Sequence, residues 1–281
     1  MTVKIVTDSS ADLPTDLAQE LGITVVPLYV RFGEEVYRER VDISEDEFYQ
    51  RLIQGPIHPV TIQPNPQDFI NVYQKLSPEA DGIVSIHISS KLSGTCNSAL
   101  QGKKMIEKGC PIEVVDSQII TVGLGLICMA AATVAKAGGG LPQVLEEVKQ
   151  MIPNTHLLGL MDTLKYLLLG GRIGKAKALL GSVLKVKPMV TLKDGEVVPA
   201  GQARTRAKGI DRLFDFVKNA TNIEDLAVAY STTPDEAQAL AERIGSIFPK
   251  EQIKLARLGT TLGVHGGPGF LAVAFREKSP A

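Results

Sequence analysis

Short apolar runs alternate with amphipathic stretches through the first half of the chain. Runs rich in β-branched residues occupy residues 3–7, 24–30, 82–89 and 112–115. Helix signals fall between these runs. Pro14 and Pro66 each suit a first helical turn, and Ser44 followed by Glu47 is a capping-box signature. Strands that alternate with helices predict βαβ units and a mostly parallel sheet.

The pattern changes after about residue 154. Asp194-Gly195 separates two strand-like runs and is a strong signal for a β-hairpin. Further strands are expected at residues 155–161, 226–231, 253–258 and 270–275, with helices at 205–218 and 234–248. We therefore predict an α/β protein of two domains. The first, residues 1–154, is an α/β domain with a mostly parallel sheet, and the second, residues 155–281, is an α+β domain with a mixed or antiparallel sheet.

Composition and charge narrow the classes of protein. A chain of 281 residues with 44% hydrophobic and 22% charged residues can build a packed core. Its net charge of −1 argues against nucleic acid as a partner. The N-terminus does not resemble a signal peptide, and the apolar stretch at residues 119–134 is short for a membrane helix. We expect a soluble, cytoplasmic protein with no integral membrane association.

Three cysteines bear on redox state and metal binding. Cys96, Cys110 and Cys128 form no CxxC motif and have no histidine nearby at metal-ligand spacing. We therefore expect three free thiols, no metal site and no cofactor.

Hydroxyl groups gather where the predicted parallel strands end, which is where ligands bind in such sheets. Residues 89–99 lead from a strand through a Ser/Gly/Thr loop into a helix. The free N–H groups of a helix start, with the hydroxyls of Ser93 and Thr95, favour a carboxylate or another anion. The simpler interpretation is an N-cap. The additional small and hydroxyl residues Ser89, Ser90 and Gly94 exceed what one cap needs and favour the anion site.

Three other segments carry candidate binding residues. Thr61 opens a loop that Pro64 and Pro66 stiffen, which could hold its hydroxyl at a fixed angle. Tyr166 and Leu167 belong to an apolar segment that can line a cavity or simply fill a core. His265 stands in a glycine-rich turn, where an imidazole can approach a ligand held between domains. Thr61 and His265 also suit ordinary polar loops.

Basic residues in the second half suggest a surface for a partner. Arg172 follows two glycines after the apolar segment, and Arg204 and Arg206 open a predicted helix. Guanidinium groups pair readily with carboxylates of a docking protein. The alternative is that these arginines face solvent or brace the second domain.

A serine hydrolase is the main enzymatic alternative. Ser93 and His265, with Asp116 or Asp8, are the residue types of a catalytic triad. No GxSxG nucleophile elbow occurs in the chain, and no phosphate-binding P-loop or GxGxxG motif is present. The sequence therefore favours a binding protein over a hydrolase.

Several motifs, taken in order, resemble the DegV family of fatty-acid-binding proteins, the carrier subunits of bacterial fatty acid kinase. The resemblance runs over nearly the whole chain and rests on TDSSADLP, TIQPNP, SSKLSGTCNSA, TLKYLLLGGRI, RTRAKGI and HGGPG. One position departs from the pattern, because Ile62 stands where the family usually has serine. Thr61 remains.

The resemblance implies two α/β domains with one long-chain fatty acid between them. Thr61 and Ser93 would hold its carboxylate, with His265 nearby. The protein would not be a catalyst. It would present the carboxylate to a separate ATP-dependent kinase that makes an acyl-phosphate for phospholipid synthesis. A lipid-sensing regulatory protein is a further alternative.

Overall fold

The first half of the chain forms a parallel sheet. The computed structural model describes residues 2–179 and 186–278. Four strands run in the order β2 (Ile23–Val26), β1 (Val3–Asp8), β6 (Gly82–His87) and β7 (Ile112–Asp116), and every neighbouring pair is parallel. The expected parallel sheet of the N-terminal half is confirmed.

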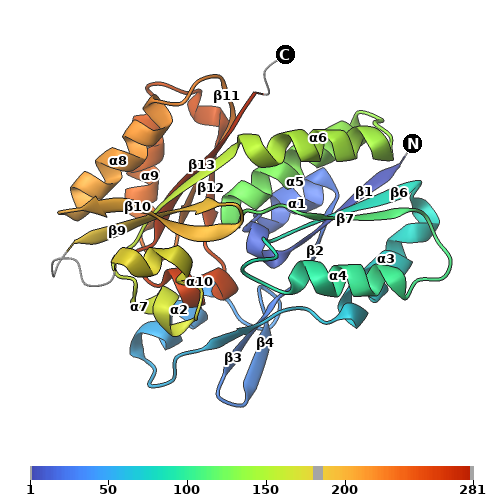
Figure 1. Ribbon diagram of the computed structural model, residues 1–281, viewed down its shortest axis with the longest axis horizontal. Helices are drawn as coiled ribbons and strands as arrows, with labels where there is room; N and C mark the ends of the chain where they lie inside the picture. Colours follow the sequence, from blue (N-terminus) through green and yellow to red (C-terminus); the bar gives the residue numbers. More distant parts are fainter. Residues whose placement is uncertain (1, 180–185, 279–281) are drawn as a thin grey trace.

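Helices cover both faces of this sheet (Figure 1). On one face lie α3 (Pro66–Leu76) and α4 (Thr95–Lys104), and on the other lie α1 (Thr15–Leu21), α5 (Thr121–Lys136) and α6 (Leu141–Asn154). Asn65 starts α3 with a complete capping box to Asp68, with Pro66 in the first turn. Ser44 accepts a hydrogen bond from the backbone N–H of Glu47 at the start of α2 (Glu45–Gln54).

The second half builds a six-stranded mixed sheet. Its order is β10 (Glu196–Ala203), β9 (Lys187–Lys193), β8 (Thr155–Leu160), β13 (Leu271–Glu277), β11 (Ile223–Tyr230) and β12 (Ile253–Arg257). All neighbours are antiparallel except β11 and β12. Helices α8 (Arg206–Lys218) and α9 (Pro234–Ile244) pack against it. The Asp194-Gly195 hairpin and the mixed, largely antiparallel sheet are confirmed.

A small third sheet was not expected from the sequence. Residues 24–30 were predicted to form one strand, but Pro27 interrupts the run. Proline has no N–H to donate to a sheet ladder, so β2 ends at Val26 and a new strand, β3 (Tyr29–Phe32), begins beyond it. This strand pairs with β4 (Glu35–Arg38) and β5 (Val60–Ile62), apart from the parallel sheet.

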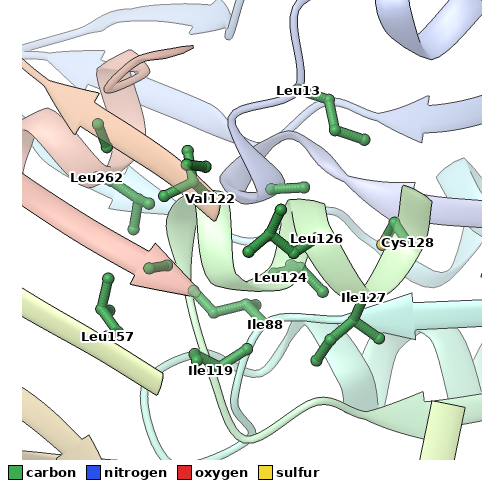
Figure 2. Close-up of a cluster of buried hydrophobic side chains, with 14 of the residues drawn as sticks. Leu13, Ile88, Ile119, Val122, Leu124, Leu126, Ile127, Cys128, Leu157 and Leu262 are labelled. Atoms are coloured by element: carbon green, nitrogen blue, oxygen red, sulfur yellow. The ribbon is translucent and has the colours of Figure 1, made fainter. Parts of the chain in front are cut away.

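Helix α5 lies at the centre of the molecule. It contacts β1 and β6 of the parallel sheet and also β8, β11 and β13 of the mixed sheet. Figure 2 shows its apolar side chains packed among residues from both halves, with Leu13 above the helix, Ile88 below it, and Leu157 and Leu262 to the left. The apolar stretch at 119–134 is thus mostly a buried core helix. Nowhere in residues 2–179 and 186–278 is a helix long and apolar enough to cross a membrane.

The remaining elements are short helices. Helix α7 is Lys165–Leu169, α10 is Thr260–Gly266, and 3₁₀ turns occupy Ser9–Ala11, Ser77–Glu79, Gly174–Leu179 and Lys250–Gln252. The prediction that His265 stands in a glycine-rich turn is therefore wrong, because the chain is helical as far as Gly266. A Cβ added at Gly263 would lie 2.6 Å from Phe48 Cε1, so glycine lets α10 pack closely against α2.

Candidate functional site

A partly polar cavity of about 110 Å³ lies between the small sheet, the loop before α4, α7 and α10. Five of the residues singled out in the sequence line it, namely Thr61, Ser93, Leu167, Arg172 and His265. They come from segments far apart in the chain, so folding brings together polar groups from both halves.

Thr61 and His265 meet at this cavity. Thr61 lies on β5, in a strand rather than in the loop expected, and β3 pairs with it through Val30. Its Oγ1 is 3.4 Å from His265 Nε2. His265 occupies the last turn of α10. A hydroxyl and an imidazole therefore converge on the same space from two different elements.

The imidazole of His265 is held neutral. Burial lowers its pKa to about 3, and the positive charge of Arg172 acts in the same direction. Its Nδ1 is buried and has no hydrogen-bond partner among the described residues. A Cβ at Gly170 would lie 2.0 Å from that Nδ1, so only glycine at this position of the α7 turn leaves room for the ring.

Ser93 enters the cavity from the loop before α4. Its Oγ lies 2.8 Å from the Oγ1 of Thr95, which is itself fully buried in the first turn of the helix. Gly94 caps the helix, and a Cβ there would overlap the Gln63 side chain, 2.1 Å from its Oε1. Gln63 lines the cavity and donates to the Oγ of Ser98.

Five of the candidate pocket residues do not line the cavity. Ser89 is buried and donates to the carbonyl of Gly195, 2.8 Å away. Ser90 is exposed and its hydroxyl pairs with Asp116. Tyr166 packs against Gly267, where an added Cβ would lie 2.2 Å from the ring. The hydroxyl of Thr95 contacts that of Ser93, which lines the cavity. Gly94 lies against the side chain of Gln63, another lining residue.

A wholly apolar cavity of about 50 Å³ adjoins the polar one. The two share five lining residues, Ile120, Leu167, Val197, Leu262 and His265. The apolar cavity is also lined by Val190, Met161 and Phe270, which lie in or next to strands of the mixed sheet. The site thus has a polar end and an apolar end.

The three candidate docking arginines have different surroundings. Arg172 lines the polar cavity and donates to the carbonyls of Leu92 and Gly170, at 3.2 and 2.9 Å. Arg204 is exposed. Arg206 is held by Glu236, 2.6 Å away, and donates to the carbonyl of Gly269. The structure therefore places Arg206 as a brace between α8, α9 and the loop after α10.

Two buried carboxylates accept hydrogen bonds from the start of α10. Glu39 is 1% exposed and accepts from the N–H and Oγ1 of Thr261, at 2.8 and 2.9 Å, and from the hydroxyl of Ser9. Asp12 accepts from Thr121 Oγ1 and from the N–H of Gly259, which caps α10. Burial raises the pKa of Asp12 to about 7.

Sequence reasoning missed several lining residues. Gln63 belongs to the TIQPNP motif, two residues after Thr61, and this proximity to Thr61 is the signal that could have identified it. Thr261 lines the cavity and is tied to Glu39, but no local pattern marks either residue. Thr261 belongs to α10, and only the fold brings Glu39 to that helix.

The described contacts do not assemble a hydrolase triad around Ser93. Asp8, one of its proposed acids, instead lies 2.9 Å from His87 Nδ1, and His87 Nε2 lies 2.7 Å from Ser85 Oγ. These three side chains are 0% exposed, so no substrate reaches them. They form a buried hydrogen-bonded network that Tyr73 extends.

Comparison with known proteins identifies the family. The family model described as "Uncharacterised protein, DegV family" matches residues 2–278. This chain belongs to the DegV family. A DegV domain-containing protein of Streptomyces coelicolor is 38% identical to it, over 98% of this chain and 99% of the relative. Protein DegV of Bacillus subtilis is 30% identical, over 99% of this chain and 100% of that protein.

Solved DegV structures share the fold. A DegV family protein from Thermus thermophilus, described for its fatty acid binding, superposes with a TM-score of 0.92 at 35% identity, covering 99% of this chain and 100% of that one. DegV of Bacillus subtilis, described as a fatty acid binding protein, gives 0.89 at 29% identity with the same coverage. A stearic acid-binding protein from Eubacterium ventriosum gives 0.88 at 28% identity, covering 99% of each chain. The family resemblance of the sequence motifs is confirmed.

Proposed function

We propose that this DegV protein binds one long-chain fatty acid between its two halves and presents the carboxylate to a separate ATP-dependent kinase. The observation that carries the proposal is the cavity, in which Thr61, Ser93 and His265 gather at the polar end and a wholly apolar space follows. The related proteins described as fatty-acid-binding support it.

The polar end suits a carboxylate. A buried charge is costly unless hydrogen bonds replace its water. Two hydroxyls supply neutral donors. The neutral imidazole of His265, whose Nε2 lies 3.4 Å from Thr61 Oγ1, adds a ring N–H. Neutral donors hold the carboxylate without a tight ion pair and leave one oxygen free to attack ATP on the kinase.

The apolar end suits the acyl chain. Burial of a methylene contributes roughly 0.8 kcal/mol, so a chain with about 14 of them gives roughly 11 kcal/mol of gross transfer free energy. A ligand held this strongly is expected to co-purify with the protein.

The kinase would dock beside the polar end. Arg172 lines the cavity, and Arg204 is exposed in the second half of the chain. Charges at the rim of an interface act mainly on the association rate and its salt dependence. Arg206 is paired with Glu236 between α8 and α9, so we do not include it in the proposed docking surface. The resulting acyl-phosphate would enter phospholipid synthesis.

Lipid retention tests the binding step. Purified wild type, Thr61→Val, Ser93→Ala and the double variant are extracted with organic solvent and their fatty acids are quantified by mass spectrometry. Each substitution removes a hydrogen bond to charge worth about 1.5–3 kcal/mol, so occupancy falls, most in the double variant. Ser90→Ala is the matched control, because its hydroxyl pairs with Asp116 outside the cavity. Full occupancy in a folded double variant contradicts the proposal.

Kinase coupling tests the presentation step. Arg204→Ala should keep its fatty acid and slow acyl-phosphate formation, with added salt weakening the wild-type reaction in the same way. Arg172→Ala should change both quantities, because its side chain also lines the cavity. Unaltered acyl-phosphate formation in Arg204→Ala places the docking surface elsewhere.

A further inference from the structure

Strands β8 and β9 of the mixed sheet are paired over only part of their length. They pair only through Gly159 with Val190 and through Leu160 with Met189, although β9 continues to Lys193. Over that length β9 stays paired with β10, so the two strands of the hairpin diverge from β8 together. A gap opens between Thr155–Leu158 of β8 and the end of β9.

The hairpin tip is fixed to the other half of the protein. The buried hydroxyl of Ser89 donates to the carbonyl of Gly195, 2.8 Å away. Gly195 has φ +79°, and a Cβ there would lie 2.4 Å from Ser89 Oγ. This tether holds the tip away from β8, while Thr191 Oγ1 spans the gap to the carbonyl of Leu157 at 2.6 Å.

An open groove of about 560 Å³ occupies the gap. Leu157 and Leu192 line this groove, and the same two side chains line the apolar cavity of the fatty-acid site. They therefore form the wall between the enclosed site and solvent. Figure 2 shows Leu157 at the edge of the core that surrounds α5.

The enclosed space explains why this wall matters. The two connected cavities measure about 110 and 50 Å³. Pockets for small molecules usually measure roughly 300–1,000 Å³. A long acyl chain thus fills this space completely and presses on the residues that line it, Leu157 and Leu192 among them.

We infer that Leu157 and Leu192 form the end wall of the acyl channel and determine the longest chain that the protein accepts. The inference rests on the proposed fatty-acid binding and adds a specificity-determining pair to it. Chains that stop before the wall fit, and longer chains would have to displace Leu192 into the groove. Removing the Leu192 side chain joins the channel to the groove and lets the methyl end pass out to solvent.

A fatty acid with a bulky fluorophore at its methyl end tests this directly. Wild type should bind the unlabelled acid and reject the labelled one, whereas Leu192→Ala should bind the labelled acid at least about tenfold more tightly than wild type does. Val190→Ala is the matched control, because Val190 lines the apolar cavity but not the groove. It enlarges the channel without opening the wall and should still reject the label.

A second variant guards against misfolding. Leu192→Phe thickens the wall, and in a series of unlabelled saturated acids its longest tightly bound chain should be shorter than that of wild type. Rejection of the label by folded Leu192→Ala, or its acceptance by Val190→Ala and wild type alike, overturns the inference. Failure of wild type to bind any unlabelled fatty acid instead overturns the proposed function.

Discussion

Asp12 and His265 change the stability of the protein with pH in opposite directions. Asp12 accepts a hydrogen bond from the N-cap of α10, and His265 lies in the last turn of that helix. The pKa of Asp12 is raised from 3.8 to about 7, so the native state keeps a proton that the unfolded chain has released. Its contribution to stability is present at low pH and is lost as pH rises through 7. The pKa of His265 is lowered from 6.5 to about 3, so its contribution is lost as pH falls below 6.5.

His265 still titrates in the unfolded chain near pH 6.5, but this contribution is common to wild type and Asp12→Asn and cancels in their difference. Between pH 6.5 and 8 the free energy of unfolding of wild type should fall by about 1 kcal/mol relative to that of Asp12→Asn. Urea denaturation at several pH values measures it. Asp42→Asn is the control, since the exposed Asp42 has its pKa lowered to about 2 and does not titrate in this range. An unchanged slope in Asp12→Asn would show that Asp12 is already ionised in the native state.

The cysteines differ in accessibility. Cys96 and Cys128 are buried, and burial raises the pKa values of their thiols to about 11 and 12. Cys110 is half-buried. A thiol reagent should therefore modify Cys110 first in the native protein, and all three thiols after denaturation without reductant. Peptide mass spectrometry reads out the sites, and an intramolecular disulfide would contradict the expectation.

At the scale of elements, the contact between α7 and α10 positions the head-group site. Gly170 has φ −78°, which alanine adopts readily, so Gly170→Ala should fold. Its new methyl group would nevertheless collide with His265 Nδ1. We expect fatty-acid retention to fall about tenfold or more, as measured by mass spectrometry of extracts. Leu169→Ala is the control, because that neighbour is exposed. Equal retention in both variants would remove His265 from the site.

Elements with local signals could be predicted from the sequence. Asp194-Gly195 predicts a hairpin because both residues adopt positive φ, at 51° and 79°, which few other pairs tolerate. Pro66 marked the start of α3 because proline suits the first turn of a helix. Thr61, Ser93 and His265 were found as members of motifs, and the structure brings them to one cavity.

The missing parts depend on distant residues. Helix α10 has the composition of a turn, and it is helical because Asp12 and Glu39 satisfy its first N–H groups from far away in the chain. No periodicity could announce such an arrangement. The wall formed by Leu157 and Leu192 depends in turn on where two strands separate, which residue type alone does not specify.

At the scale of the molecule, the boundary near residue 154 separates the sheets but not the core. Helix α5 precedes it and packs against both sheets. We expect one cooperative unfolding transition, with circular dichroism and fluorescence curves that coincide. Fragments 1–154 and 155–281, expressed separately, should each fail to fold, because each lacks one side of the shared core. Two separate transitions, or a folded fragment, would contradict this expectation.

The shared helix also has a consequence for synthesis on the ribosome. Chains emerge from the N-terminus, and domains usually fold as they appear. Here β13, which lies between β8 and β11, is the last strand of the mixed sheet to be made, long after α5. The face of α5 that covers this sheet therefore lacks part of its cover until Leu271–Glu277 has been made. The nascent chain must keep this apolar helix from aggregating through roughly the second half of its translation.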